Sequence, residues 1–247
     1  MIGDTTERRS SISTASNDTR EGSFLRWAGW SGIIGTLAFI ATIVMTTGGV
    51  AAPAGPGDIA RFLDAVAANG PTEYVYGTAG IALSVLYIPM AFGVYRMLER
   101  TTAAWYGTAA VVVGLAVLLP AYVINLLAPF AFVPLGATLG GAGVEALYAD
   151  YEIARAVAEI FFTVGSLLSL AFGPLAWGNA WLRSSARRWL GWTAILTGIT
   201  GMIWFVWLID DGLIGIVLMV NVLASLVFFT GASVVLVARG GSSRLRA

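Results

Sequence analysis

Three residue types are absent from the 247-residue chain: cysteine, histidine and lysine. Without cysteine no disulfide framework can form, and without cysteine or histidine the usual zinc, copper, haem and iron–sulfur ligand sets cannot be assembled. Without lysine no Schiff base with retinal or pyridoxal phosphate can form, and without histidine the Ser-His and Cys-His nucleophile pairs are excluded. The sequence therefore predicts no metal and no cofactor, and it favours a protein that is not an enzyme. Chemistry that uses carboxylates alone stays open.

Charge is also scarce. Charged residues make up 11% of the chain and hydrophobic residues 57%, with a net formal charge of zero and a mean hydropathy of +0.81. This composition lies outside the usual range of soluble domains and predicts an integral membrane protein, whose main partner is the lipid bilayer. All 14 basic residues are arginine and are balanced by 14 acidic residues, so no nucleic-acid partner is predicted.

Six long apolar stretches follow a polar start. Each can cross a hydrocarbon core of about 30 Å, which takes about 20 helical residues. A backbone in lipid must satisfy its own hydrogen bonds, so continuous apolar runs of this length predict helices. The first run is longer than the core of a secretory signal and is expected to be retained. The predicted spans are Trp27–Val50, Tyr74–Tyr95, Ala104–Leu127, Ile153–Trp181, Trp189–Ile209 and Leu213–Ala238.

The arginines predict the orientation of these spans. When successive loops are assigned to opposite sides, twelve arginines fall on one side and only Arg61 and Arg155 on the other. Positive residues favour the cytoplasmic side. The sequence therefore predicts an all-α, multi-pass protein of the plasma membrane, with six transmembrane helices and both termini in the cytoplasm. The twelve are Arg8, Arg9, Arg20, Arg26, Arg96, Arg100, Arg183, Arg187, Arg188, Arg239, Arg244 and Arg246.

The chain divides into a membrane domain and two tails. Residues 1–23 are polar and predict a disordered cytoplasmic tail. Residues 24–238 are expected to form the six-helix transmembrane domain, and residues 239–247 a short cytoplasmic tail.

Two outer loops are expected to be long. Residues 58–70 have the spacing of a short amphipathic helix, capped by Asp58 and stopped by Asn69-Gly70-Pro71. This helix either rests on the outer surface of the membrane or forms a lid over a cavity. Residues 129–150 are rich in glycine and proline at their start and predict a second loop that stays near the membrane.

The fourth span carries a stripe of polar residues. At 100° per residue, Glu152, Arg155, Glu159, Thr163 and Ser166 lie within about 80° of one helix face. One charge at the bilayer centre costs at least ~2.5 kcal/mol, so the stripe is predicted to face other helices or a water-filled cleft instead of lipid. Arg155 and Glu159 are four residues apart and can pair.

Two asparagines, Asn125 and Asn221, are expected at a similar depth in the third and sixth spans. With the stripe they would form an outward-facing polar pocket, in which Arg155 binds an anionic group and Glu159 carries a proton. The alternative is that the stripe holds helices together, as buried polar groups in membrane bundles do. The residues of this hypothetical ligand or proton pathway are Glu152, Arg155, Glu159, Thr163, Ser166, Asn125 and Asn221.

Three segments carry a family resemblance: residues 57–70, 151–178 and 187–201, which read GDIARFLDAVAANG, YEIARAVAEIFFTVGSLLSLAFGPLAWG and RRWLGWTAILTGITG. They resemble a bacterial family of six-span membrane proteins catalogued as a domain of unknown function, of the 4386 type. The resemblance covers about residues 24–238. It implies a fold and a membrane location, with no known activity to transfer.

Two functions remain after these exclusions. The first is a non-enzymatic membrane protein that acts as a partner or stabilising subunit for another membrane protein, or as a homo-oligomer. The alternative is a small-molecule transporter or proton-linked permease that uses the polar stripe of the fourth span.

Overall fold

The computed structural model describes residues 4–47, 59–139, 141–184, 187–205 and 211–242. Over these ranges the regular structure is entirely helical, which confirms the predicted all-α class. The elements are α1 (Asp4–Thr47), α2 (Ile59–Met97), α3 (Thr102–Thr138), α4 (Gly141–Ser166), the π-helix η1 (Leu167–Phe172), α5 (Gly173–Arg183), α6 (Arg188–Phe205) and α7 (Asp211–Ser242).

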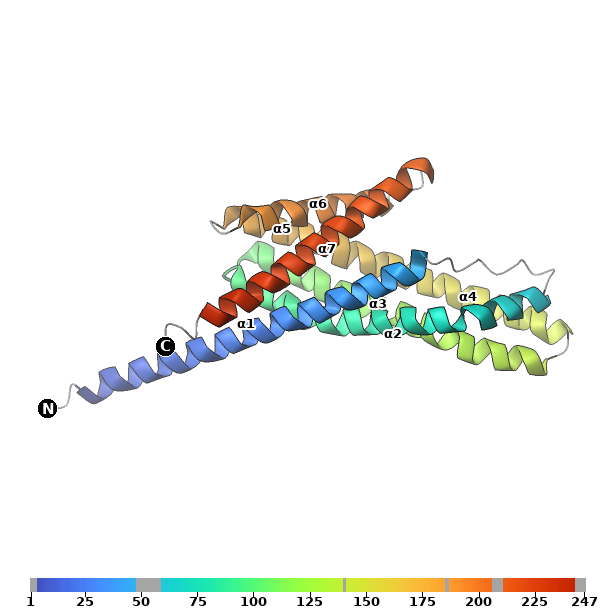
Figure 1. The fold of residues 1–247 in the computed structure, drawn as a ribbon, viewed down its shortest axis with the longest axis horizontal. Coiled ribbons are helices and arrows are strands. Elements are labelled where there is room, and N and C mark those ends of the chain that lie inside the picture. The colour runs from blue at the N-terminus through green and yellow to red at the C-terminus, as the bar shows by residue number, and fades with distance from the viewer. Residues whose placement is uncertain (1–3, 48–58, 140, 185–186, 206–210, 243–247) are drawn as a thin grey trace.

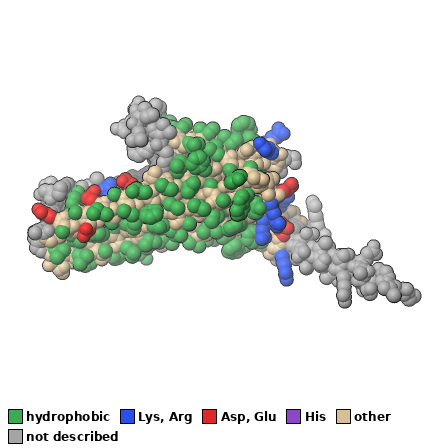
Figure 2. Space-filling view, turned by 180° about the vertical axis from the view of Figure 1, so that it is seen from behind, with side chains coloured by type: hydrophobic (Ala, Val, Ile, Leu, Met, Phe, Trp, Pro, Cys, Tyr) green, Lys and Arg blue, Asp and Glu red, His purple; other side chains and the backbone are tan. Residues whose placement is uncertain are grey.

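Five of the described helical segments are long and apolar enough to cross a membrane. The described part of α6 has 18 residues, slightly fewer than the about 20 that a core of about 30 Å requires. Large apolar side chains also cover the surface (Figure 2), and Trp27, Ile160 and Met219 are each more than half exposed. Such a surface suits lipid and not water. The chain is therefore a multi-pass helical bundle of the membrane type. The five segments are Arg20–Met45, Gly70–Met97, Thr102–Phe132, Glu145–Arg183 and Ile216–Ser242.

The helices form one bundle with a buried centre (Figure 1). Helix α1 packs between α2 and α7, α3 packs on α2 and α4, and α6 packs on α5 and α7. The fully buried side chains at the centre include Trp177, Phe228 and Met90.

Most of the arginines whose side chains the structure describes gather at one end of the bundle (Figure 2), whereas Arg155 of α4 lies toward the other. The end with most of the arginines holds the last turns of α2 and α5, the first turns of α3 and α6, and the last turn of α7. Helix α7 ends there beside α1. Gly240 of α7 lies so close to α1 that an added Cβ atom would overlap the carbonyl oxygen of Gly22. We call this the arginine end and the opposite one the outer end.

Three helices extend further toward the outer end than the sequence predicted. Helix α2 starts at Ile59 and continues through Asn69, Gly70 and Pro71, so the stop predicted there is wrong; Asp58, its predicted cap, lies outside the described residues. Helix α3 continues to Thr138 and α4 begins at Gly141, so residues 129–150 are almost wholly helical.

Packing between these extensions explains why local stop signals are overridden. The rings of Tyr74 and Phe130 meet edge to face at 6.1 Å, and those of Phe132 and Tyr151 at 5.3 Å. Contacts between helices can outweigh the weak preferences of single residues.

Helix α1 starts at Asp4, so its helical backbone includes residues 4–23, for which composition predicted a disordered tail.

The fourth span is interrupted, as Pro174 allows. Helix α4 changes to the π-helix η1 at Leu167, and α5 begins at Gly173 with Pro174 in its first turn. Proline has no N–H group to donate to the preceding turn. The backbone N–H of Gly173 donates to the carbonyl of Leu168, five residues earlier, which is the π pattern.

Candidate functional site: a cavity in the outer half of the bundle

The polar stripe of the fourth span does not lie in a single environment. Arg155, Glu159 and Thr163 are exposed, and Glu152 is half-buried. Ser166 is buried, as is Ser169 one turn further. The stripe therefore divides into an exposed outer part, Arg155, Glu159 and Thr163, and a buried inner part that begins at Ser166.

Depth gives the physical reason. Counted from Arg183 at the arginine end, Thr163 lies about 30 Å along the helix, Glu159 about 36 Å and Arg155 about 42 Å. A hydrocarbon core of about 30 Å ends near Thr163. A core that begins at Arg183 would therefore leave the two charges outside it, where exposure costs little.

The charged half of the stripe meets α2. The positive charge of Arg155 interacts electrostatically with the carboxyl group of Glu73 on α2. The hydroxyl group of Tyr151 interacts in the same way with Glu73, Arg155 and Glu152. Glu73 was not among the predicted site residues. Among the described residues no salt bridge within 4.0 Å joins Arg155 to Glu159. Arg155 thus lies within electrostatic range of a carboxylate on a neighbouring helix, which a pattern read along one helix could not reveal.

A cavity of about 470 Å³ lies deeper, among α1, α2, α3, the α4–η1 segment and α7. We call it the central cavity. The described residues of its lining are mostly apolar and include no charged side chain. Its size and composition fall in the range of small-molecule sites, which bury most of a ligand in apolar surface with a few polar groups. Met219 of α7 lines it and is 64% exposed, so the lining includes a residue at the surface of the bundle.

The central cavity contains two of the seven predicted site residues, Ser166 and Asn221. The structure does not place Asn125 or the four outer stripe residues in its lining. Asn125 is half-buried on α3, at about the same depth as Glu159. The predicted pocket is therefore divided into charged groups at the outer end and a nearly apolar cavity below them.

Asn221 presents a polar atom to this apolar space. Its amide nitrogen donates to the carbonyl of Thr197 at 2.8 Å and to the hydroxyl of Thr200 at 3.1 Å, both on α6. Both N–H groups are thereby used, so the Oδ1 oxygen is the atom of this side chain that remains for a ligand. Ser169, by contrast, donates its hydroxyl to the carbonyl of Gly165 at 2.8 Å.

Tyr87 and Phe229 form the floor of the central cavity. Their rings are stacked with centroids 4.8 Å apart and an angle of 24° between planes. The hydroxyls of Tyr87 and Thr36 lie 3.0 Å apart. Thr36 gives its only hydroxyl hydrogen to the carbonyl of Gly32 at 2.9 Å, so Tyr87 is the donor of this pair. The floor is fixed by bonds within the protein.

More aromatic rings continue below the floor toward the arginine end. Phe228 lies 5.2 Å from Phe229, 6.0 Å from Trp177 and 5.9 Å from Trp181, measured between ring centroids. The indole N–H of Trp177 donates to the hydroxyl of Thr108 at 3.1 Å. We call Tyr87, Phe228, Phe229, Trp177 and Trp181 the aromatic layer; all five are at most 2% exposed. The layer lies on the inner side of the central cavity, whose lining includes two of its members, Tyr87 and Phe229.

Comparisons with known protein families, with curated proteins and with solved structures find no match. The family resemblance carried by residues 57–70, 151–178 and 187–201 therefore stays a prediction.

Proposed function

We propose that the protein is a six-span plasma-membrane protein that takes a small apolar or amphipathic molecule from the outer leaflet into the central cavity, as the binding step of a small transporter. The cavity carries this proposal. It lies in the outer half of the bundle, has surface-exposed Met219 in its lining, and has Tyr87 and Phe229 of the aromatic layer as its floor.

The chemistry of the lining supports an apolar ligand with one polar group. Leu115, Leu118 and Phe162 supply apolar walls, and Oδ1 of Asn221 supplies an acceptor. Arg155 and Glu159 are not among the described residues that line the cavity, so in this proposal they have no direct part in binding. This differs from the proton-linked mechanism suggested by the sequence, in which those two residues handle substrate and proton.

The absence of native cysteine makes the proposal testable by single-cysteine labelling. Ser169→Cys lines the central cavity, whereas Ser233→Cys, its control, is buried where α7 packs against Gly32 of α1. In membranes, N-ethylmaleimide should label Ser169→Cys and leave Ser233→Cys unlabelled. Added 1-aminoanthracene, an apolar fused-ring probe, should slow labelling of Ser169→Cys at least fivefold. Equal labelling of both variants, or no protection by the probe, would remove the case for a ligand cavity.

A second candidate, a partner or stabilising subunit, is favoured by a different observation. Arg155, Glu159 and Thr163 form an exposed polar face on α4, where a second helix could pair with them. In that case Glu159→Cys should form a disulfide-linked dimer or a cross-link to another membrane protein on mild oxidation. An exclusively monomeric product would count against it.

A further inference from the structure

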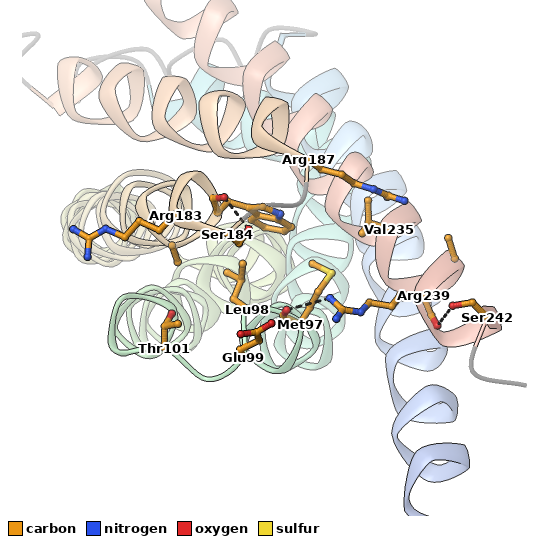
Figure 3. Close-up of a pocket in the computed structure, with 13 residues that line it drawn as sticks. Met97, Leu98, Glu99, Thr101, Arg183, Ser184, Arg187, Val235, Arg239 and Ser242 are labelled. Carbon is orange, nitrogen blue, oxygen red and sulfur yellow. Dashed lines mark hydrogen bonds between the residues drawn. The ribbon is translucent and has the colours of Figure 1, made fainter. Parts of the chain in front are cut away.

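A second pocket, of about 820 Å³, lies at the arginine end and is separate from the central cavity (Figure 3). We call it the arginine pocket. It is formed by the α2–α3 turn, the end of α5, the residue before α6 and the last turns of α7. Its floor is buried and apolar, and includes Leu98, Trp181 and Val235.

Its rim is strongly basic. Arg183, Arg187 and Arg239 border the pocket, together with a single carboxylate, Glu99. In Figure 3 Arg183 extends away from the pocket, whereas Arg187 and Arg239 lie on either side of Val235. Among the described residues no salt bridge within 4.0 Å joins Glu99 to an arginine. The positive charge at the rim is therefore not neutralised by this carboxylate.

Arg239 is held in place across the pocket. Its Nη1 donates to the carbonyl of Met97 at 3.3 Å, which joins the end of α7 to the end of α2 (Figure 3). A guanidinium group has five N–H donors, so this bond leaves others for an anion. Arg187 lies on the opposite side of the rim, and a phosphate between the two could accept charge-assisted bonds from both.

The backbone around the pocket is strained at two points of the rim. Glu99 and Arg187 have left-handed φ angles of 56° and 58°, which side chains with a Cβ adopt at a cost in free energy. Strain of this kind is found more often where a segment must present a group to a ligand. The two strained residues lie in the two connections between helices that contribute to the rim, the α2–α3 turn and the segment before α6.

The tendency of arginines to gather on one side of a membrane does not by itself explain this pocket. That tendency needs only positive loops near the helix ends. It does not require a concave apolar floor with two arginines opposed across it. An apolar floor beneath a basic rim suits a molecule with an anionic head and an apolar part, and basic pockets between membrane helices are known to bind anionic lipid head groups.

We propose that the arginine pocket binds a phosphate-bearing anion, with Arg187 and Arg239 on the phosphate and Trp181 and Leu98 against the apolar part of the ligand. The phosphate belongs either to a lipid head group or to a free ion, and both sources share this chemistry. The proposal does not depend on the central cavity, so either can fail alone.

The test uses the full chain in phosphatidylcholine nanodiscs and measures the rise of Tm with added ligand, from which Kd follows. The probes are dihexanoyl phosphatidate, dihexanoyl phosphatidylcholine and inorganic phosphate. The pocket variant is Arg187→Gln with Arg239→Gln. The matched control, Arg100→Gln with Arg188→Gln, removes the same charge from the same end but outside the pocket lining.

We expect saturable stabilisation by phosphatidate and not by phosphatidylcholine, weakened at least tenfold in the pocket variant and less than twofold in the control. The same pattern with inorganic phosphate would assign the site to a free phosphate. The proposal is overturned if neither anion saturates, or if the control loses as much affinity as the pocket variant. If the double variant does not fold, Arg239→Gln alone, an exposed change, is judged by the same criteria.

Discussion

At the scale of single residues, the turn between α2 and α3 stores strain that glycine would relieve. Arg100 has a φ of 56°, and its N–H donates to the carbonyl of Tyr95 at 3.1 Å, which fixes the turn. A left-handed residue with a Cβ costs ~1–2 kcal/mol, and glycine avoids most of that cost. We expect Arg100→Gly to raise the free energy of unfolding by about 1 kcal/mol. The measurement is reversible unfolding in mixed micelles of increasing SDS content. Arg100→Ala removes the same charge and keeps the strain; an equal gain in that control would contradict the explanation.

Single residues also set the limit of what could be predicted about the site. Ser166 and Asn221 could be found in the sequence because a polar residue inside an apolar run is conspicuous, and both line the central cavity. Tyr87 and Phe229 could not be distinguished from ordinary apolar residues, because their importance comes from a stacking contact between α2 and α7. Glu73 was missed because it lay in an expected loop, and its link to Arg155 crosses from α2 to α4.

At the scale of helices, small residues let α3 and the fourth span touch. A Cβ atom at Gly114 would lie 2.6 Å from the backbone nitrogen of Ser169 and 2.7 Å from the carbonyl oxygen of Gly165. Backbone atoms cannot move aside as a flexible side chain can. We expect Gly114→Ala to separate these helices and lower the free energy of unfolding by about 1–3 kcal/mol, in the range for overpacking. Gly241→Ala is the control, since nothing lies within 4 Å of a Cβ there. The same SDS titration decides: similar stability of both variants would mean that the contact is not tight.

Helix boundaries at the outer end show where reading a sequence locally fails. The apolar runs predicted the helical cores correctly, because about 20 apolar residues in lipid leave the backbone no other structure. Asn69-Gly70-Pro71 and the Gly- and Pro-rich segment after Leu127 would normally end a helix. In this protein α2, α3 and α4 pack against one another beyond the depth of a bilayer core, and ring contacts such as that of Tyr74 with Phe130 hold the extensions together. No single-helix pattern contains that information.

At the scale of the whole molecule, the two pockets lie on either side of the aromatic layer. Phe229 lines the central cavity and Trp181 lines the arginine pocket, while Phe228 contacts both rings. A small transporter must never open a path through the protein to both sides of the membrane at once. A layer of packed rings between two pockets satisfies that need. The layer spans α2, α5 and α7, so tilting α7 away from α2 would break the stack of Tyr87 on Phe229 first.

Removing the ring of Phe228 should join the two pockets. Phe228→Ala takes away a ring that packs against both Phe229 and Trp181, and a hole of this size in a core costs about 3–5 kcal/mol. Under the predicted orientation, inverted vesicles turn the arginine end to the medium, and the membrane-impermeant sulfonate reagent MTSES added there should not reach Ser169→Cys in the otherwise native chain. It should label that cysteine in the Phe228→Ala background. Phe92→Ala, at a half-exposed ring of α2 outside the layer, is the control and should stay unlabelled.

Protection of Ser233→Cys from N-ethylmaleimide in the Phe228→Ala background would establish that the variant is still folded. Labelling of Ser169→Cys from the arginine end in the native chain would mean that the aromatic layer does not close the cavity. Folded Phe228→Ala that stays unlabelled would mean that Trp177 and Tyr87 seal the layer without it. Labelling of Ser169→Cys from the arginine end in the native chain would also remove the physical basis for alternating access, because a cavity open at both ends cannot hold a molecule on one side of the membrane.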